Sequence, residues 1–196
     1  MSLLPFLLFA LVASITPGPT NVLILGHSAR HGARASLPLV LGGSLGAVAL
    51  VLVVGFGLGQ TLAQHPDWQR GLAWAGVLWL SWLAWQLARA GAPAVAVADD
   101  SARLGFGGTA GLQVLNPKSW SMALAVVTVY AEPGADLWHQ VLVLALVFLL
   151  VSVPCLGLWA LLGRVAAHGL KSTRAWRGFN LGMAALLLAS AWATVV

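Results

Sequence analysis

Long apolar segments separated by short polar connections make up most of this chain. A helix needs about 20 mainly apolar residues to cross roughly 30 Å of hydrocarbon. Six segments meet this requirement, and none alternates polar and apolar residues as the strands of a membrane barrel do. We therefore predict an all-α membrane protein with spans at Leu3 to Gly26, Leu37 to Leu62, Gly71 to Ala88, Leu104 to Tyr130, Val141 to Leu162, and Phe179 to Val196.

The composition agrees with this pattern. The chain has 196 residues, of which 60% are hydrophobic and 8% are charged, and its mean hydropathy is +0.90. A soluble domain carries roughly a quarter charged residues, so an ordinary water-soluble fold is excluded. The basic residues lie between apolar segments and form no long run. We therefore expect membrane lipid, and no nucleic acid, around this protein.

The connections between the predicted spans differ in charge. Those after the first, third and fifth spans hold eight basic residues, whereas the other two hold one. The eight are Arg30, Arg34, Arg89, Arg103, Arg164, Lys171, Arg174 and Arg177. Basic loops remain in the cytoplasm, so both termini are predicted to lie outside. The first segment has no basic residue before its apolar run, and we expect an uncleaved helix there, not a signal peptide.

The longest connection divides the chain into two halves. This connection, Arg89 to Arg103, is rich in alanine and valine and also contains proline and glycine, and its residues 91–103 are predicted to be a cytoplasmic linker between residues 1–90 and 104–196. Each half holds three spans. Because three is odd, the second half enters the membrane upside down relative to the first, which is an inverted repeat. We expect one transmembrane transporter domain over residues 1–196.

Two proline motifs interrupt apolar segments at matching places in the two halves. The first is Thr16-Pro17-Gly18-Pro19-Thr20-Asn21, and the second is Asn116-Pro117-Lys118-Ser119. Proline lacks the N–H of a helix interior, so the helix opens there. Thr16 and Asn116 are suited to be N-caps, with Pro17 and Pro117 as the first helical residues. The breaks lie roughly 20 Å and 18 Å from opposite faces, so we expect them to meet near the midplane.

The breaks have the chemistry of a small binding site. A helix start attracts carboxylates, and we expect the carbonyls freed by the breaks to receive an ammonium group. Lys118 within a span costs roughly 2.5–3.5 kcal/mol on insertion scales, which favours a functional role, although a shallower lysine that reaches the interface is the alternative. Gln113, Asn21 and, with less reason, Asn180 either face the same cavity or form interhelical hydrogen bonds. A kink without a ligand is the alternative for the prolines.

The sequence gives little sign of catalysis or of metal binding. No aspartate or glutamate lies deep in a predicted span, and the histidines show no ligand spacing. His27 lies near the inner end of the first span, where we expect an interfacial residue. The single cysteine, Cys155, cannot form an internal disulfide or a redox pair. We expect no enzyme, no cofactor and no metal site.

Glycine pairs four residues apart suggest closely packed helices. The pairs are Gly42 and Gly46, Gly55 and Gly59, Gly107 and Gly111, and Gly178 and Gly182.

Three motifs make the chain resemble the LysE/RhtB family of bacterial amino-acid exporters. They are Thr16-Pro17-Gly18-Pro19, Arg30-His31-Gly32 and Leu115-Asn116-Pro117-Lys118, and the similarity covers the whole length. The resemblance implies efflux of a small amino acid across the bacterial inner membrane, driven by the proton-motive force, and a homodimer. Many relatives have asparagine where this chain has Thr20, which puts the substrate in doubt. The site residues expected from motif and resemblance together are Thr16, Pro17, Gly18, Pro19, Asn21, Gln113, Asn116, Pro117 and Lys118.

Our leading hypothesis is a secondary exporter whose halves rock around the paired breaks. An exporter of a metal or small inorganic ion is the alternative within transport, although the lack of intramembrane carboxylates argues against cations. A membrane scaffold is the alternative outside transport, and it would not require a lysine beside a broken helix.

Overall fold

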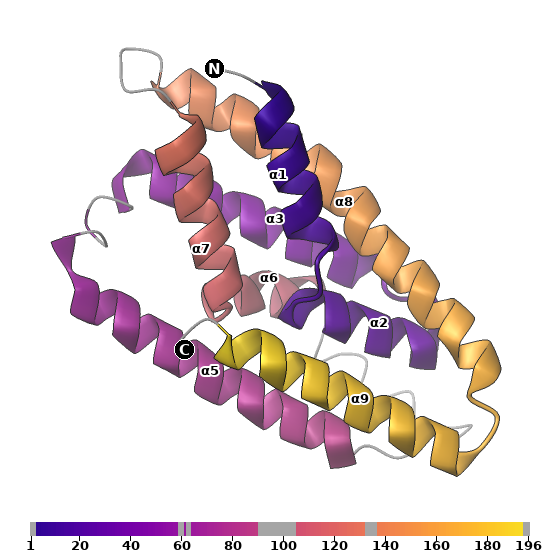
Figure 1. Cartoon of the computed structure of the whole chain (residues 1–196). Helices are drawn as coiled ribbons and strands as arrows, with labels where there is room; N and C mark the ends of the chain where they lie inside the picture. Colours follow the sequence, from indigo (N-terminus) through magenta and orange to yellow (C-terminus); the bar gives the residue numbers. More distant parts are fainter. Residues whose placement is uncertain (1–2, 59–60, 62–63, 90–104, 132–136, 194–196) are drawn as a thin grey trace.

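Every regular element in the part of the chain that the structure describes is a helix (Figure 1). The structure is a computed structural model and describes residues 3–58, 61, 64–89, 105–131 and 137–193. The elements are α1 (Leu3–Ile15), α2 (Pro19–His31), α3 (Leu37–Val53), the π-helical turn η1 (Val54–Leu58), α5 (Pro66–Arg89), α6 (Phe106–Val114), α7 (Pro117–Ala125), the π-helical turn η3 (Val126–Tyr130), α8 (Leu137–Gly169) and α9 (Thr173–Trp192). The prediction of an all-helical protein is confirmed for these residues.

Two of these helices are long and apolar enough to cross a membrane unaided. They are the continuous run Leu37–Gly57, which joins α3 to η1, and the 33-residue α8. The pair α1 and α2 makes a third candidate if its two bent halves count as one span. Helices α5 and α9 and the pair α6–α7 coincide with apolar segments but are not among these candidates. The six-span inverted repeat therefore stays a prediction.

Several helix ends differ from the predicted spans. Helix α5 begins at Pro66 instead of Gly71, and α8 continues to Gly169 instead of ending at Leu162. Helix α9 begins at Thr173, because the side chain of Ser172 accepts a hydrogen bond from the backbone N–H of Ala175 at 3.1 Å and caps it. A hydropathy pattern marks the apolar part of a helix, whereas the hydrogen-bonded turns continue into polar residues. Leu62, the linker 91–103 and the end of the last span at Val196 lie outside the described residues.

The helices form a bundle, and the connections from α1 to α2 and from α6 to α7 lie toward its middle (Figure 1). Helix α8 packs along α1, α2 and α3, and α3 also packs against α6 and α7. Helices α5 and α9 run side by side along one face of the molecule and contact the interior through α7 and α2, respectively. The interior of the bundle is therefore bounded by α3 and α8 on one side and by the α5–α9 pair on the other.

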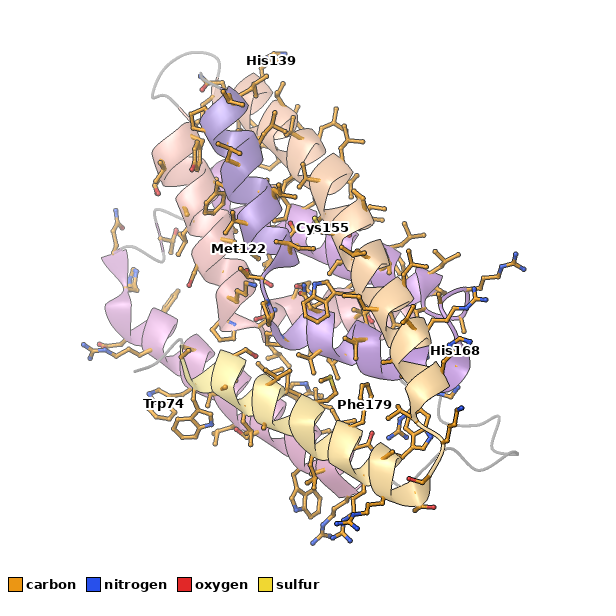
Figure 2. All side chains as sticks on the ribbon, turned by 45° about the vertical axis from the view of Figure 1, so that its right-hand side comes forward. Trp74, Met122, His139, Cys155, His168 and Phe179 are labelled. Carbon is orange, nitrogen blue, oxygen red and sulfur yellow. The ribbon has the colours of Figure 1, made fainter. Side chains whose placement is uncertain are left out.

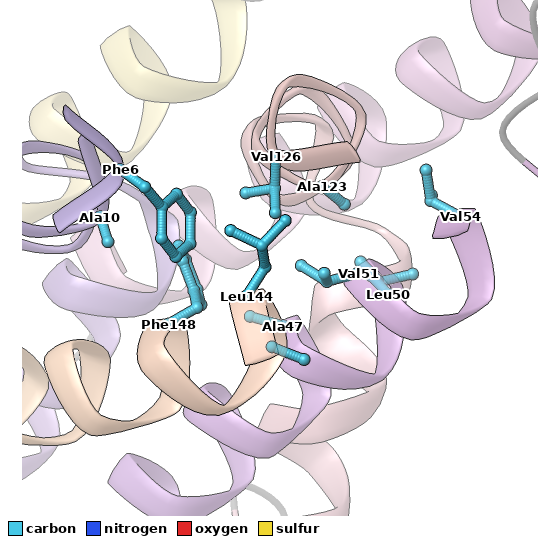
Figure 3. Packing of buried hydrophobic residues seen from close by; sticks show 11 residues of the cluster. Phe6, Ala10, Ala47, Leu50, Val51, Val54, Ala123, Val126, Leu144 and Phe148 are labelled. Atoms are coloured by element: carbon cyan, nitrogen blue, oxygen red, sulfur yellow. The ribbon is translucent and has the colours of Figure 1, made fainter. Parts of the chain in front are cut away.

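One apolar cluster joins α1, α3, α7 and α8 (Figure 3). Phe6 and Ala10 of α1 meet Phe148 and Leu144 of α8, and Val126 of η3 completes the contact. The outer faces of the same helices carry exposed leucines, such as Leu8 and Leu150. A helix that is apolar on all sides is typical of a membrane span. In lipid, such clusters stabilise the bundle mainly by close packing, because the tails outside are equally apolar.

The predicted glycine contacts are only partly correct. A Cβ atom at Gly42 would meet the backbone carbonyl of Phe106, and one at Gly46 would lie 2.7 Å from the carbonyl oxygen of Ala110, so α3 and α6 approach closely. Gly55 faces Val141 in the same way. The prediction is wrong for the pairs in α6 and α9, where an added Cβ would meet nothing within 4 Å. Those glycines are Gly107, Gly111, Gly178 and Gly182. Gly59 lies outside the described residues.

Basic side chains gather toward one end of the bundle. Several nitrogen-tipped side chains lie near the turn between α8 and α9, where Figure 2 labels His168. Arg164, Lys171 and Arg174 belong to this turn or flank it, and Arg89 ends α5 at the same end of the molecule. This distribution agrees with the loop charges, but no membrane is present, so the orientation stays a prediction.

Candidate functional site

The first break bends the chain between α1 and α2 by 51°. The hydroxyl of Thr16 donates to the carbonyl of Val12 at 2.8 Å, so Thr16 extends the last turn of α1. Gly18 is the extended N-cap residue, with φ −161° and ψ 173°, and Pro19 is the first residue of α2. The prediction that Thr16 is the N-cap and Pro17 the first helical residue is therefore wrong. Two prolines follow one another closely here, and the second one starts the helix.

The second break follows the prediction. Asn116 is the N-cap of α7, and its side-chain oxygen accepts a hydrogen bond from the backbone N–H of Lys118 at 3.1 Å. Pro117 is the first helical residue, a position at which its missing N–H costs nothing. Gly76 of α5 lies directly against the Leu115 carbonyl and the Pro117 ring, and a Cβ there would collide with both. Because Gly76 has no side chain, α5 can pack closely against the break between α6 and α7.

The two breaks meet through the side chain of Lys118. Its Nζ atom donates to the backbone oxygen of Thr16 at 2.9 Å, to the Thr16 hydroxyl at 3.0 Å, and more distantly to the Pro17 oxygen at 3.5 Å. A Cβ added at Gly18 would lie 3.0 Å from Cδ and 3.1 Å from Nζ of Lys118. The Lys118 side chain thus reaches from the start of α7 to the end of α1. Gly18 has no side chain and leaves room for it.

Side chains of the protein itself occupy the carbonyls that the first break sets free. Asn21 Nδ2 donates to the Ser14 oxygen at 2.9 Å, and Trp159 Nε1 of α8 donates to the Ile15 oxygen at 3.1 Å. Lys118 Nζ donates to the backbone oxygens of Thr16 and Pro17. The last carbonyls of a helix have no partner within the helix, so these bonds replace the turn that the prolines interrupt. We expected a ligand's ammonium group at these carbonyls; in the conformation described they accept hydrogen bonds from the protein, and the expectation stays a prediction.

A buried network of amides and hydroxyls joins α2 to the second break. Gln113 Nε2 donates to the Thr20 hydroxyl at 2.9 Å and to the Thr109 oxygen at 3.1 Å. Its Oε1 atom accepts from the Ser119 hydroxyl at 2.7 Å, and Asn116 Nδ2 lies 3.5 Å from the Thr20 hydroxyl. Gln113 was predicted as a candidate, but Thr20 and Ser119 were not. Short hydroxyl residues are common in membrane helices, so nothing in the sequence distinguished these two.

A pocket opens between the breaks and the inner faces of α3 and α8. It encloses about 380 Å³ of space between atoms, part of which is open to the surroundings. Its apolar wall includes Met122, labelled in Figure 2, and Phe148 and Leu156 of α8. Its polar wall consists of Ser14, Thr20, Asn21, Ser44, Gln113, Asn116, Lys118, Ser119 and Ser152.

Six of the nine predicted site residues line this pocket. They are Gly18, Pro19, Asn21, Gln113, Asn116 and Lys118. Thr16 and Pro17 are exposed and contribute through their bonds to Lys118, and Pro117 does not line the pocket. The weaker candidate Asn180 lies elsewhere, where its side-chain oxygen accepts from Arg30 Nη2 at 2.9 Å.

Lys118 is the charged group of the pocket. No other ionisable side chain lines it among the described residues, and no cluster of three or more histidine, cysteine or acidic residues occurs in that part of the chain. All three printed partners of the ammonium are neutral oxygens. A cation removed from water is costly unless an anion compensates it, so the pocket favours an anionic group at Lys118.

Comparisons with known proteins agree with one another. The model of the LysE type translocator family matches residues 11–195. A cysteine/O-acetylserine efflux protein of Salmonella typhimurium is 29% identical over 192 residues, which cover 96% of this chain and 94% of the relative. The protein of the same description from Klebsiella pneumoniae is 29% identical over 166 residues, or 82% and 81% of the two chains. An uncharacterized membrane protein of Vibrio cholerae is 32% identical over 147 residues, or 73% and 71%. No solved structure matches this chain.

Proposed function

The chain belongs to the LysE type translocator family, and we propose that it exports a small amino acid from the cytoplasm. The observation that carries this proposal is Lys118. Its ammonium lies at the pocket between two broken helices, bound only to neutral oxygens in the described residues. An amino acid brings the carboxylate that this cation lacks.

The carboxylate is bound mainly by the lysine side chain in this proposal, and only secondarily by helix starts. At α7, the N–H of Lys118 is already bonded to the Asn116 side chain, and the N–H of Ser119 bonds to the Asn116 carbonyl at 2.9 Å. Helix α2 begins with Pro19, which has no N–H, and the first intrahelical bond is that of Val22 to Gly18 at 3.0 Å. The N–H groups of Thr20 and Asn21 at that start are thus placed to assist Lys118.

Alternating access around the breaks is the mechanism we propose. In the two halves, α1 corresponds to α6, α2 to α7, α3 to α8 and α5 to α9. Several contacts between the described helices recur when each helix is exchanged for its counterpart, as a repeat requires. Helix α3 packs on α6 as α8 packs on α1, and α7 packs on α3 as α2 packs on α8. The contacts α3–α8 and α5–α9 each map onto themselves under the same exchange. These relations support two repeated halves, with the pocket at the contact between them.

Movement of one half against the other would have to break the bonds of Lys118 to α1. An arriving carboxylate competes with the carbonyls of Thr16 and Pro17 for the same three N–H donors. Because a carboxylate binds an ammonium more strongly than a neutral carbonyl does, substrate would release the end of α1 from α7. Binding would in this way be coupled to the loosening of the first break.

The experiment is an export assay in cells that lack their own cysteine exporters. Cells expressing the chain should hold less of at least one amino acid than cells with an empty vector, and should tolerate more of it outside. Cysteine and O-acetylserine are tested first, because the relatives carry those names. Metal salts form a parallel arm. Tolerance to a metal with unchanged amino-acid levels would replace this proposal with ion export, and no change in either arm would favour a scaffold.

A further inference from the structure

Two serine hydroxyls in the pocket have no hydrogen-bond partner within the described residues. Ser14 of α1 is 6% exposed and Ser44 of α3 is 0% exposed, and the Oγ atoms of both are unpartnered. Both residues line the pocket that contains Lys118. Buried hydroxyls are nearly always hydrogen-bonded, so two exceptions at one pocket need a reason.

The usual solution for such residues is available here and is not used. A serine or threonine inside a helix commonly donates to the carbonyl three or four residues earlier. Thr109 donates in this way to Gly105 at 3.1 Å, Ser121 to Pro117 at 3.1 Å, and Ser152 to Leu149 at 3.2 Å. Ser14 and Ser44 also lie inside helices, yet their hydroxyls form no such bond. Their hydrogen-bonding capacity therefore remains available to a molecule in the pocket.

Three other polar side chains of the pocket already form hydrogen bonds with the protein. Gln113 bonds through both of its terminal atoms, Asn21 donates to the Ser14 carbonyl, and Lys118 holds the first break. The pocket thus offers a bound molecule the positive charge of Lys118, the N–H groups at the start of α2 and two free hydroxyls. It offers no acidic side chain among the described residues, and Phe148 and Leu156 limit its apolar side.

We propose that Ser14 and Ser44 bind the uncharged polar end of the substrate's side chain. A hydroxyl both donates and accepts, so it suits a hydroxyl, thiol or ester group, whereas a basic side chain would require a carboxylate. The pocket then selects small neutral amino acids with such a group over apolar ones of the same size and over basic ones. This inference rests on the proposed export function, since it assigns the specificity of the same site.

The test compares Ser14→Ala and Ser44→Ala, alone and together, with the wild type in proteoliposomes. Two nearly isosteric pairs, serine with alanine and threonine with valine, measure the preference for a hydroxyl, and O-acetylserine and lysine complete the panel. The wild type should prefer the polar member of each pair. Each alanine variant should lower that preference roughly three- to tenfold, the effect of one lost hydrogen bond, with little change for the apolar member. Ser121→Ala is the matched control, because Ser121 bonds within its helix and does not line the pocket.

A second readout separates binding from a structural role. Because the two hydroxyls satisfy nothing in the protein, the unfolding temperature of either substrate-free variant should equal or exceed that of the wild type. A lower unfolding temperature, an unchanged preference, or an equal loss for both members of each pair would each overturn the inference while export itself stood. A wild type that transports nothing in the panel would instead overturn the proposed function, and this inference with it.

Discussion

At the scale of the residue, the site depends on a few polar side chains that are each bound by a neighbour from the other half of the chain. Thr20 of α2 accepts from Gln113 of α6, and Lys118 of α7 binds Thr16 at the end of α1. Polar groups away from water must be paired, so these contacts fix how the two breaks face each other. They also explain why the chain retains an amide and a lysine within apolar segments.

Replacing Thr20 with valine tests this network. The substitution keeps the shape of the side chain and removes the acceptor for Gln113 Nε2 and Asn116 Nδ2. We expect the free energy of unfolding to fall by about 1–3 kcal/mol, the cost of leaving buried partners unsatisfied. The measurement is denaturant unfolding of the purified protein in detergent. Thr128→Val is the control, because the exposed Thr128 hydroxyl in η3 donates to the carbonyl of Leu124, four residues earlier at the end of α7. Equal effects of the two substitutions would mean that the network contributes no stability.

The sequence alone was enough to identify the site residues whose polar or charged side chains are unusual in an apolar segment. Lys118, Asn116 and Gln113 stand out because each is costly in lipid, and each takes part in the contacts between the breaks. Ser14 and Ser44 were not predicted. A serine in an apolar helix is unremarkable, because it can bond within its own helix, and only the packing reveals that these two do not.

At the scale of the element, the two breaks are built differently although their motifs look alike. The second break is a standard helix start, capped by Asn116. At the first break, Asn21 of α2, Trp159 of α8 and Lys118 of α7 bind backbone carbonyls at the end of α1. The motifs predicted that both helices would break. They did not predict which proline starts α2, because Pro17 and Pro19 satisfy the same local rule.

Close approach of α3 to α6 holds the second break against the rest of the bundle, and a pair of glycine substitutions tests it. Gly42→Ala should destabilise the protein by about 1–3 kcal/mol, because the new Cβ would meet the Phe106 carbonyl and force the backbones apart. Gly111→Ala on α6 meets nothing within 4 Å and should be neutral or stabilising by about 1 kcal/mol, since alanine favours a helix more than glycine does. Thermal unfolding in detergent measures both. A stable Gly42→Ala protein would show that this contact is loose.

At the scale of the whole molecule, several helix contacts of one half have counterparts in the other, and a pocket lies between the two breaks. The hydropathy pattern predicted a helical protein and the two proline motifs predicted breaks in the first and fourth apolar segments, and the described helices agree with both. The number of spans depends on how α5, α9 and the short pair α6–α7 lie relative to lipid, which neither hydropathy nor helix length decides. The inner-membrane location, the outward termini and the homodimer likewise stay predictions.

The central claim is that the ammonium of Lys118 binds the carboxylate of an amino acid between the two breaks. Uptake of a labelled amino acid into proteoliposomes preloaded with the same amino acid tests it most directly, comparing the wild type with Lys118→Met and Lys171→Met. Both variants remove one lysine charge, but Lys171 lies exposed between α8 and α9. We expect exchange by the wild type and by Lys171→Met, and at least a tenfold loss in Lys118→Met despite normal insertion, as one charged contact is worth about 1.5–3 kcal/mol. Undiminished exchange by Lys118→Met would contradict this account.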